Sequence, residues 1–131
     1  MKVTLLLFLG ILLSQAAQSQ SSYGMYPLIT IGKINETPRD TVKLKVYVVE
    51  VYVCPPCPPG AQCKPCMENN ITVADEKLKD ISKVPAEKLL RVITREAESF
   101  KIGKRYFLTV RFRRNKETQS EDAVLVSSKA F

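Results

Sequence analysis

The stretch TVKLKVYVVEVYV, residues 41–53, decides the fold. Its apolar residues first fall on even positions, with Lys43 and Lys45 between them, and from Val49 onward they fall on odd positions. Alternation with period two indicates a strand, and a change of phase indicates a β-bulge, because one extra residue turns every later side chain to the other face. A strand buried on both faces near its centre would give the same pattern. Either interpretation predicts a long strand, and a long bent strand is how a small barrel turns a corner.

Five shorter strand signals accompany this long one. The clearest alternates Tyr106, Leu108 and Val110 with Arg105 and Phe107, which gives one strand an apolar face and a basic face. The other runs are short, apolar and rich in β-branched residues, and turn-forming residues separate them. The strands predicted besides 41–53 are 28–31, 71–74, 89–94, 104–113 and 123–127.

Residues 86–100 carry two conflicting patterns. Several of their apolar residues recur at helical spacing, and Pro85 is a residue that can open a helix. Residues 92–94 are all β-branched, however, and such residues favour strands. We therefore expect a strand over 89–94, followed by a turn that ends at Gly103.

Four to six strands with little helix, in about 110 residues, predict a mostly β fold, a small five-stranded barrel. The order is a long bent strand, a hairpin, a third strand, a linker ending in Gly and two final strands, and it resembles an oligonucleotide/oligosaccharide-binding (OB) fold. FKIGKRYFLTV, residues 100–110, is also similar to the Gly-then-Tyr start of a strand in the netrin-like domains of tissue metalloproteinase inhibitors. The Cys-x-Cys motif of those inhibitors is missing. The resemblance therefore implies an OB-like fold, with enzyme inhibition as an alternative function.

The N-terminus reads as a secretory signal peptide. Lys2 precedes an apolar run over residues 5–13, and Ala17 and Ser19 fit the small-residue pattern before a cleavage site. The run is shorter than the ~20 residues that a transmembrane helix needs, so we expect no membrane span in the mature chain. The predicted organisation of this secreted or periplasmic protein is a signal peptide over 1–19, a flexible lead-in over 20–27 and one OB-like domain over 28–131.

The composition of the mature chain argues against several kinds of site. The chain has no His, so it lacks the usual general base near neutral pH, the commonest metal ligand and any Ser-His or Cys-His nucleophile pair. No spacing of carboxylates or lysines announces a catalytic site, and we expect no enzymatic activity. The whole chain carries a net charge of +7, and removal of the segment that holds Lys2 leaves +6. This mild basicity permits binding to acidic surfaces without requiring it.

Four cysteines lie in the Pro-rich segment CPPCPPGAQCKPC, residues 54–66. An even number of cysteines in a short exported chain indicates structural disulfides. Cys54 ends one predicted strand and Cys66 lies just before the next, so the two can face each other across the neck of a hairpin. Cys57 and Cys63 can then close its tip. Of the three possible connectivities, we expect this nested one.

Two alternatives remain open for the four cysteines. Two Cys-x2-Cys pairs are the usual signature of zinc, so Cys54, Cys57, Cys63 and Cys66 could hold this metal as a cofactor. The five-residue connection between the pairs is shorter than the ~15–20 residues usual in zinc ribbons, and prolines have no N–H to steady a thiolate. A redox-active dithiol is the other alternative, although the Pro58-Pro59-Gly60 sequence disfavours the helix that such sites use.

The strand over 104–113 has a basic outer face. Nucleic-acid binders combine basic and aromatic side chains in this way, whereas charges on an edge strand more often discourage pairing with other chains. The loop after the first strand of an OB fold flanks its binding face, so the cysteine loop is a second candidate surface. We expect a non-catalytic binding or structural module whose partner is a protein or an acidic polysaccharide rather than nucleic acid. The candidate anion-binding residues are Arg105, Phe107, Arg111, Arg113 and Arg114.

Overall fold

The computed structural model describes residues 26–37 and 40–131. The predicted signal peptide over 1–19 and most of the predicted lead-in over 20–27 lie outside the described residues. Within the described part, no helix has the length and apolar character needed to cross a membrane.

The described chain consists of strands and short 3-10 helices. The strands are β1 (Leu28–Ile29), β2 (Thr41–Tyr52), β3 (Asn70–Ala74), β4 (Leu89–Ile93), β5 (Arg105–Arg114) and β6 (Glu121–Ala130). The 3-10 helices are η1 (Ile31–Glu36), η2 (Ile81–Lys83), η3 (Ala86–Lys88) and η4 (Ala97–Ser99). The expectation of a mostly β fold with little helix is confirmed.

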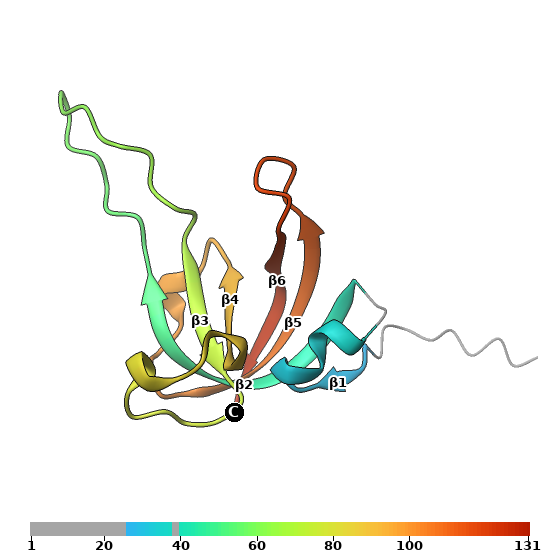
Figure 1. Cartoon of the computed structure of the whole chain (residues 1–131). Coiled ribbons are helices and arrows are strands. Elements are labelled where there is room, and N and C mark those ends of the chain that lie inside the picture. Colours follow the sequence, from blue (N-terminus) through green and yellow to red (C-terminus); the bar gives the residue numbers. More distant parts are fainter. Residues whose placement is uncertain (1–25, 38–39) are drawn as a thin grey trace, which may run out of the picture.

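Five of the six strands pair in a closed order, β2-β3-β4-β6-β5 and back to β2 (Figure 1). The β4–β6 pair is parallel and the other four pairs of this ring are antiparallel. This order and these directions are those of an OB fold, a small, partly open Greek-key barrel. The seam between β4 and β6 is narrow, because it consists of the pairs Val92–Ala123 and Ile93–Val124. The two-residue strand β1 lies parallel to β2 outside the ring.

Strand β2 bends so that it can serve two neighbours. Residues 41–47 pair with β5 and residues 47–52 pair with β3, with a register shift between Val48 and Glu50. The backbone N–H of Gly103 donates to the Val48 carbonyl at 2.7 Å, so the chain before β5 is fastened at the start of the irregularity. The β-bulge predicted from the change of phase near Val49 is confirmed.

The core fills the barrel with aliphatic side chains from every strand of the ring. Burying a side chain of this kind contributes about 1.5–3 kcal/mol relative to leaving it in water. Tyr106 packs against Phe100 with its ring centroid 4.9 Å away, and its hydroxyl accepts a hydrogen bond from the Lys101 N–H at 3.0 Å. The largest fully buried side chains are Leu44, Ile71, Leu108, Val42, Val46, Val48, Val73, Val92 and Val110.

Two of the predicted strands differ from the structure by two residues or more at an end, whereas the other four agree to within one residue. The first strand ends at Ile29 rather than at residue 31, because the chain turns into η1, where the N–H of buried Ile31 donates to both carboxylate oxygens of Asp75 at 3.1 Å. The last strand extends over Glu121–Ala130 rather than 123–127. Its second half pairs with the start of β5 but is exposed, so no alternation of apolar residues marks it in the sequence. The ambiguous segment 86–100 contains the expected strand, as β4.

Candidate binding surfaces

Residues 54–66 form a finger that extends from the barrel beyond the ends of β2 and β3 (Figure 1). We call it the cysteine finger. Two disulfides cross it, Cys54–Cys66 at its neck and Cys57–Cys63 nearer its tip, with Cα atoms 5.7 and 5.9 Å apart. This is the nested connectivity expected from the sequence. Residues 55–66 are all exposed, so the finger contributes nothing to the core.

The neck of the cysteine finger is fastened to the barrel by two consecutive asparagines. The Cys54 N–H donates to the Asn69 side-chain oxygen at 2.8 Å, and the Asn69 carbonyl accepts from the Thr94 N–H at 3.0 Å. The Asn70 side-chain amide, which is buried, donates to the Glu68 carbonyl at 2.8 Å. These contacts fix where the finger leaves the barrel, and the two disulfides restrict how it continues.

The disulfides decide which chemistry the four cysteines can perform in this state. A sulfur bonded to another sulfur is not a thiolate, and thiolate is the form that ligates zinc or attacks a disulfide. Among the described residues there is no free cysteine, and no group of three or more His, Cys, Asp or Glu side chains is placed to hold a metal ion. Zinc binding or dithiol chemistry at this segment would therefore require the bridges to be reduced.

The loop between β5 and β6 projects from the same end of the barrel as the cysteine finger (Figure 1). Between them the Arg113 guanidinium lies 3.2 Å from the Glu68 carboxylate, so an ion pair links β5 to the base of the finger. Beside this pair lies an open hollow of about 520 Å³ with both signs of charge. Its lining residues are Glu68, Arg113, Arg114, Asn115, Lys116, Glu117 and Asp122.

The sequence did not single out the acidic and amide members of this hollow. Glu68 and Asp122 lie 54 positions apart, and only the ring order of the strands brings them together. Asn115 organises the loop, because its side-chain oxygen accepts from the Glu117 N–H at 2.9 Å and its amide donates to Asp122 at 3.1 Å. An Asn at the start of a polar segment is the one local signal that could have indicated this turn.

The five candidate anion-binding residues do not form one site. Arg113 and Arg114 lie at the finger end of β5, whereas Arg105 and Phe107 lie at its start. Arg113 lies eight positions after Arg105 on the strand, a distance of roughly 26 Å at about 3.3 Å per residue. Arg111, which is exposed, lies between the two groups.

The group at the start of β5 includes residues from outside this strand that no local sequence pattern indicates. The Arg105 guanidinium lies 4.2 Å from the ring centroid of Phe131 and 5.6 Å from that of Tyr47. The Lys45 ammonium lies 4.9 Å from the Phe131 centroid, and the Phe107 and Phe131 rings are 4.6 Å apart. We call these five residues the basic–aromatic cluster. Lys45, Tyr47 and Phe131 come from other parts of the sequence and reach Arg105 through strand pairing.

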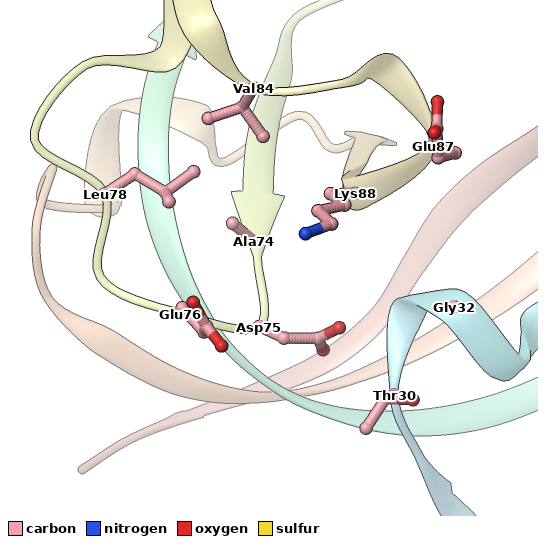
Figure 2. A pocket seen from close by; sticks show the side chains of 9 residues that line it. All are labelled: Thr30, Gly32, Ala74, Asp75, Glu76, Leu78, Val84, Glu87 and Lys88. Carbon is pink, nitrogen blue, oxygen red and sulfur yellow. The ribbon is translucent and has the colours of Figure 1, made fainter.

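A second hollow, of about 340 Å³, lies between η1 and the segment that connects β3 to β4. Figure 2 shows the Lys88 side chain pointing into it and the Glu87 carboxylate pointing away. The Asp75 carboxylate at its edge already accepts the hydrogen bonds from Ile31, so its role is structural. Nearby, hydrogen bonds from the hydroxyl and the N–H of Ser82 lower the pKa of the exposed Asp80.

No protein-family model matches the chain, and no curated protein matches it. Among solved structures it is similar to the OB4 domain of the yeast telomere protein Cdc13, with a TM-score of 0.49 and 17% sequence identity. The match covers 77% of this chain and 87% of that domain. The OB topology of this chain follows from its own strand pairing and does not depend on this likeness.

Proposed function

We propose that this protein is a non-catalytic binding module that works outside the cytoplasm and holds a partner protein at the finger end of its barrel. The observation that carries the proposal is the cysteine finger, an exposed segment with two internal disulfides that leaves the same end of the barrel as the β5–β6 loop. In OB folds, the loop after the first strand of the ring and the loop between its fourth and fifth strands border the ligand. Here those two loops are residues 53–69 and 115–120.

The rigidity of the finger supports a binding role rather than a spacer role. A flexible loop loses conformational freedom when it binds, and this loss weakens the complex. In the cysteine finger, two disulfides and five prolines have already removed much of that freedom before any partner arrives. A segment that only connected β2 to β3 would not need this reinforcement, because it is exposed and outside the core.

The chemistry of the finger end supports a protein partner. The finger presents prolines and small residues with Lys64 as its single charge, while the adjacent hollow offers Arg113, Arg114, Glu68 and Glu117. Apolar surface next to charges of both signs complements a protein surface, which carries the same mixture. The hollow is lined by three cations and three carboxylates, so it gives a polyanion no net electrostatic attraction.

Disulfides and the predicted signal peptide support a place outside the cytoplasm, because disulfides persist in oxidising compartments. The absence of His from the chain supports a non-catalytic role. An inhibitor of the netrin-like type rests only on the resemblance of residues 100–110, and the sequence lacks the motif of those inhibitors, so we do not propose that activity.

Site-specific photocrosslinking tests the proposal in cells that make the protein with its own N-terminus. A photoreactive phenylalanine at Gln62, near the finger tip, is expected to form an adduct with a defined extracytoplasmic protein. The matched control places the same group at Lys79, which is exposed on the β3–β4 connection away from the finger. Equal adducts from both positions, or a protein retained in the cytoplasm with four free thiols, would contradict the proposal.

A further inference from the structure

We propose that the basic–aromatic cluster is a second binding site, at the opposite end of β5 from the cysteine finger, and that it takes the sulfate or carboxylate groups of an acidic polysaccharide. The proposal shares only the compartment with the function proposed above, since acidic polysaccharides are found outside cells. It concerns different residues, a different surface and a different kind of partner.

Three neighbouring strands bring the cluster together on the outer side of the barrel. Lys45 and Tyr47 of β2 are directly opposite Phe107 and Arg105 of β5, and paired residues place their side chains on the same face. On the other side of β5, the Phe131 N–H donates to the Arg105 carbonyl at 3.2 Å. The same alternation turns Tyr106 and Leu108 into the core, so the barrel itself fixes the cluster outward.

The two cations of the cluster are positioned but not neutralised. Both lie within 5 Å of the Phe131 ring centroid, where the negative face of the ring attracts them and limits their motion. The ion pairs found among the described residues join other side chains: Lys33–Glu36, Lys83–Asp80 and Arg113–Glu68. An aromatic ring carries no net charge, so Lys45 and Arg105 each keep a full positive charge. Among residues 26–37 and 40–131, no carboxylate lies within ion-pair distance of either cation.

Further positive charge surrounds the cluster. Lys129 of β6 is paired with Phe107, and Lys43 lies two residues before Lys45 on the same face of β2. Cations that are already held in place lose less conformational freedom on binding than mobile ones. Because several such cations lie at fixed spacings, a ligand that carries several spaced anionic groups can contact more than one of them at once. A single anion at an exposed pair would gain little, because solvent and salt screen such contacts.

The state of the rings favours a polysaccharide over single-stranded nucleic acid. Nucleic acid of this kind is held by bases that stack on free aromatic faces. In the cluster, Phe131 lies against Phe107 and beneath both cations, and Tyr47 lies beside Arg105, so the rings serve as supports for charge. The groups left for a ligand to contact are the positioned charges of Lys45 and Arg105, and these suit the anionic groups of an acidic polysaccharide.

Heparin binding by the oxidised full-length mature protein, measured by calorimetry at about 0.15 M salt, tests this inference. The variant Lys45→Gln/Arg105→Gln is expected to bind heparin about tenfold more weakly, with a shallower dependence on salt. The matched control, Lys77→Gln/Lys79→Gln, removes the same charge from the exposed β3–β4 connection and is expected to stay within about twofold of the wild type. Phe131→Ala, which changes no side-chain charge, is expected to weaken binding severalfold, because the cations lose their support.

Three results would overturn the inference. Equal losses from both double variants would mean that overall charge, and not the cluster, attracts heparin. Wild-type protein that does not bind at this salt concentration would exclude the site. Tighter binding to single-stranded DNA than to heparin of the same charge would assign the cluster to nucleic acid. The variant Cys57→Ser/Cys63→Ser should keep full heparin binding. Loss of heparin binding would therefore count against the basic–aromatic cluster alone, whereas loss of crosslinking at Gln62 would count against the proposed function of the finger.

Discussion

The backbone N–H of Gly103 donates a 2.7 Å hydrogen bond to the carbonyl of Val48, the residue at which β2 changes register. In return, the Val48 N–H donates to the Lys104 carbonyl at 3.1 Å. Gly103 adopts a φ of +80°, a conformation that side chains disfavour. The turn before β5 and the bend of β2 are therefore one structural unit, and a glycine holds it together.

Replacement of Gly103 by alanine should destabilise the protein by about 1–2 kcal/mol. The cost comes from the backbone conformation alone, because an added Cβ would meet no atom within 4 Å. Urea denaturation measures the change. Gly32→Ala is the matched control, since Gly32 also has open space around it but no positive φ. The free energy of unfolding of this variant should be nearly that of the wild type.

Val110→Ala should cost about 2–3 kcal/mol, because Val110 is fully buried in the barrel and the truncation leaves a cavity. The same substitution at Val126, which is 50% exposed on β6, should change the free energy of unfolding by less than about 0.5 kcal/mol. Equal effects at the two positions would show that the interior of the barrel is not where the structure places it.

Removal of the Asp75 carboxylate should loosen η1. Asp75→Ala leaves the N–H of buried Ile31 without its acceptor, which costs about 1–3 kcal/mol. Asp75→Asn keeps one side-chain oxygen and should lose less. Hydrogen exchange of the Ile31 amide reports the change directly, and an exchange rate that stays the same in the alanine variant would contradict the assigned bond.

The two disulfides should differ in their contribution to stability. The Cys54–Cys66 bridge closes the neck next to the barrel, and its loss should cost up to about 3 kcal/mol in the chain-entropy model, less where prolines already stiffen the loop. Loss of Cys57–Cys63 frees a segment that is exposed in the folded state, so folded and unfolded chains gain similar freedom. Cys57→Ser/Cys63→Ser should therefore unfold at nearly the wild-type urea concentration, while Cys54→Ser/Cys66→Ser should not.

The barrel could be predicted because its strands carry a period-two signal against one core. The bulge near Val49 was visible as a change of phase, and the strand over 89–94 was visible through its β-branched residues. The end of β6 was missed because Ser128, Lys129 and Ala130 are exposed, and no burial imposes an alternation of apolar residues on them.

The candidate surfaces were less accessible to sequence reasoning than the fold. The arginines of β5 suggested one anion-binding site. They are spread over all ten residues of the strand, however, so the first and the last of them lie too far apart to share a site. The partners of Arg105 are Tyr47 and Phe131, 58 and 26 residues away in the chain, and strand pairing alone makes them neighbours. Local patterns predict elements, whereas such clusters depend on which elements become adjacent.

The order in which the strands pair around the barrel also affects how fast the chain folds. The pair Val42–Val110 joins residues 68 positions apart, and the seam at β4 closes only when β6, the last strand, inserts beside it. Barrels dominated by such distant contacts fold slowly, in milliseconds to seconds. The cysteines, by contrast, are only 6 and 12 positions from their partners. The finger can thus be oxidised while the remainder of the chain is still unfolded, so its covalent maturation need not wait for barrel closure.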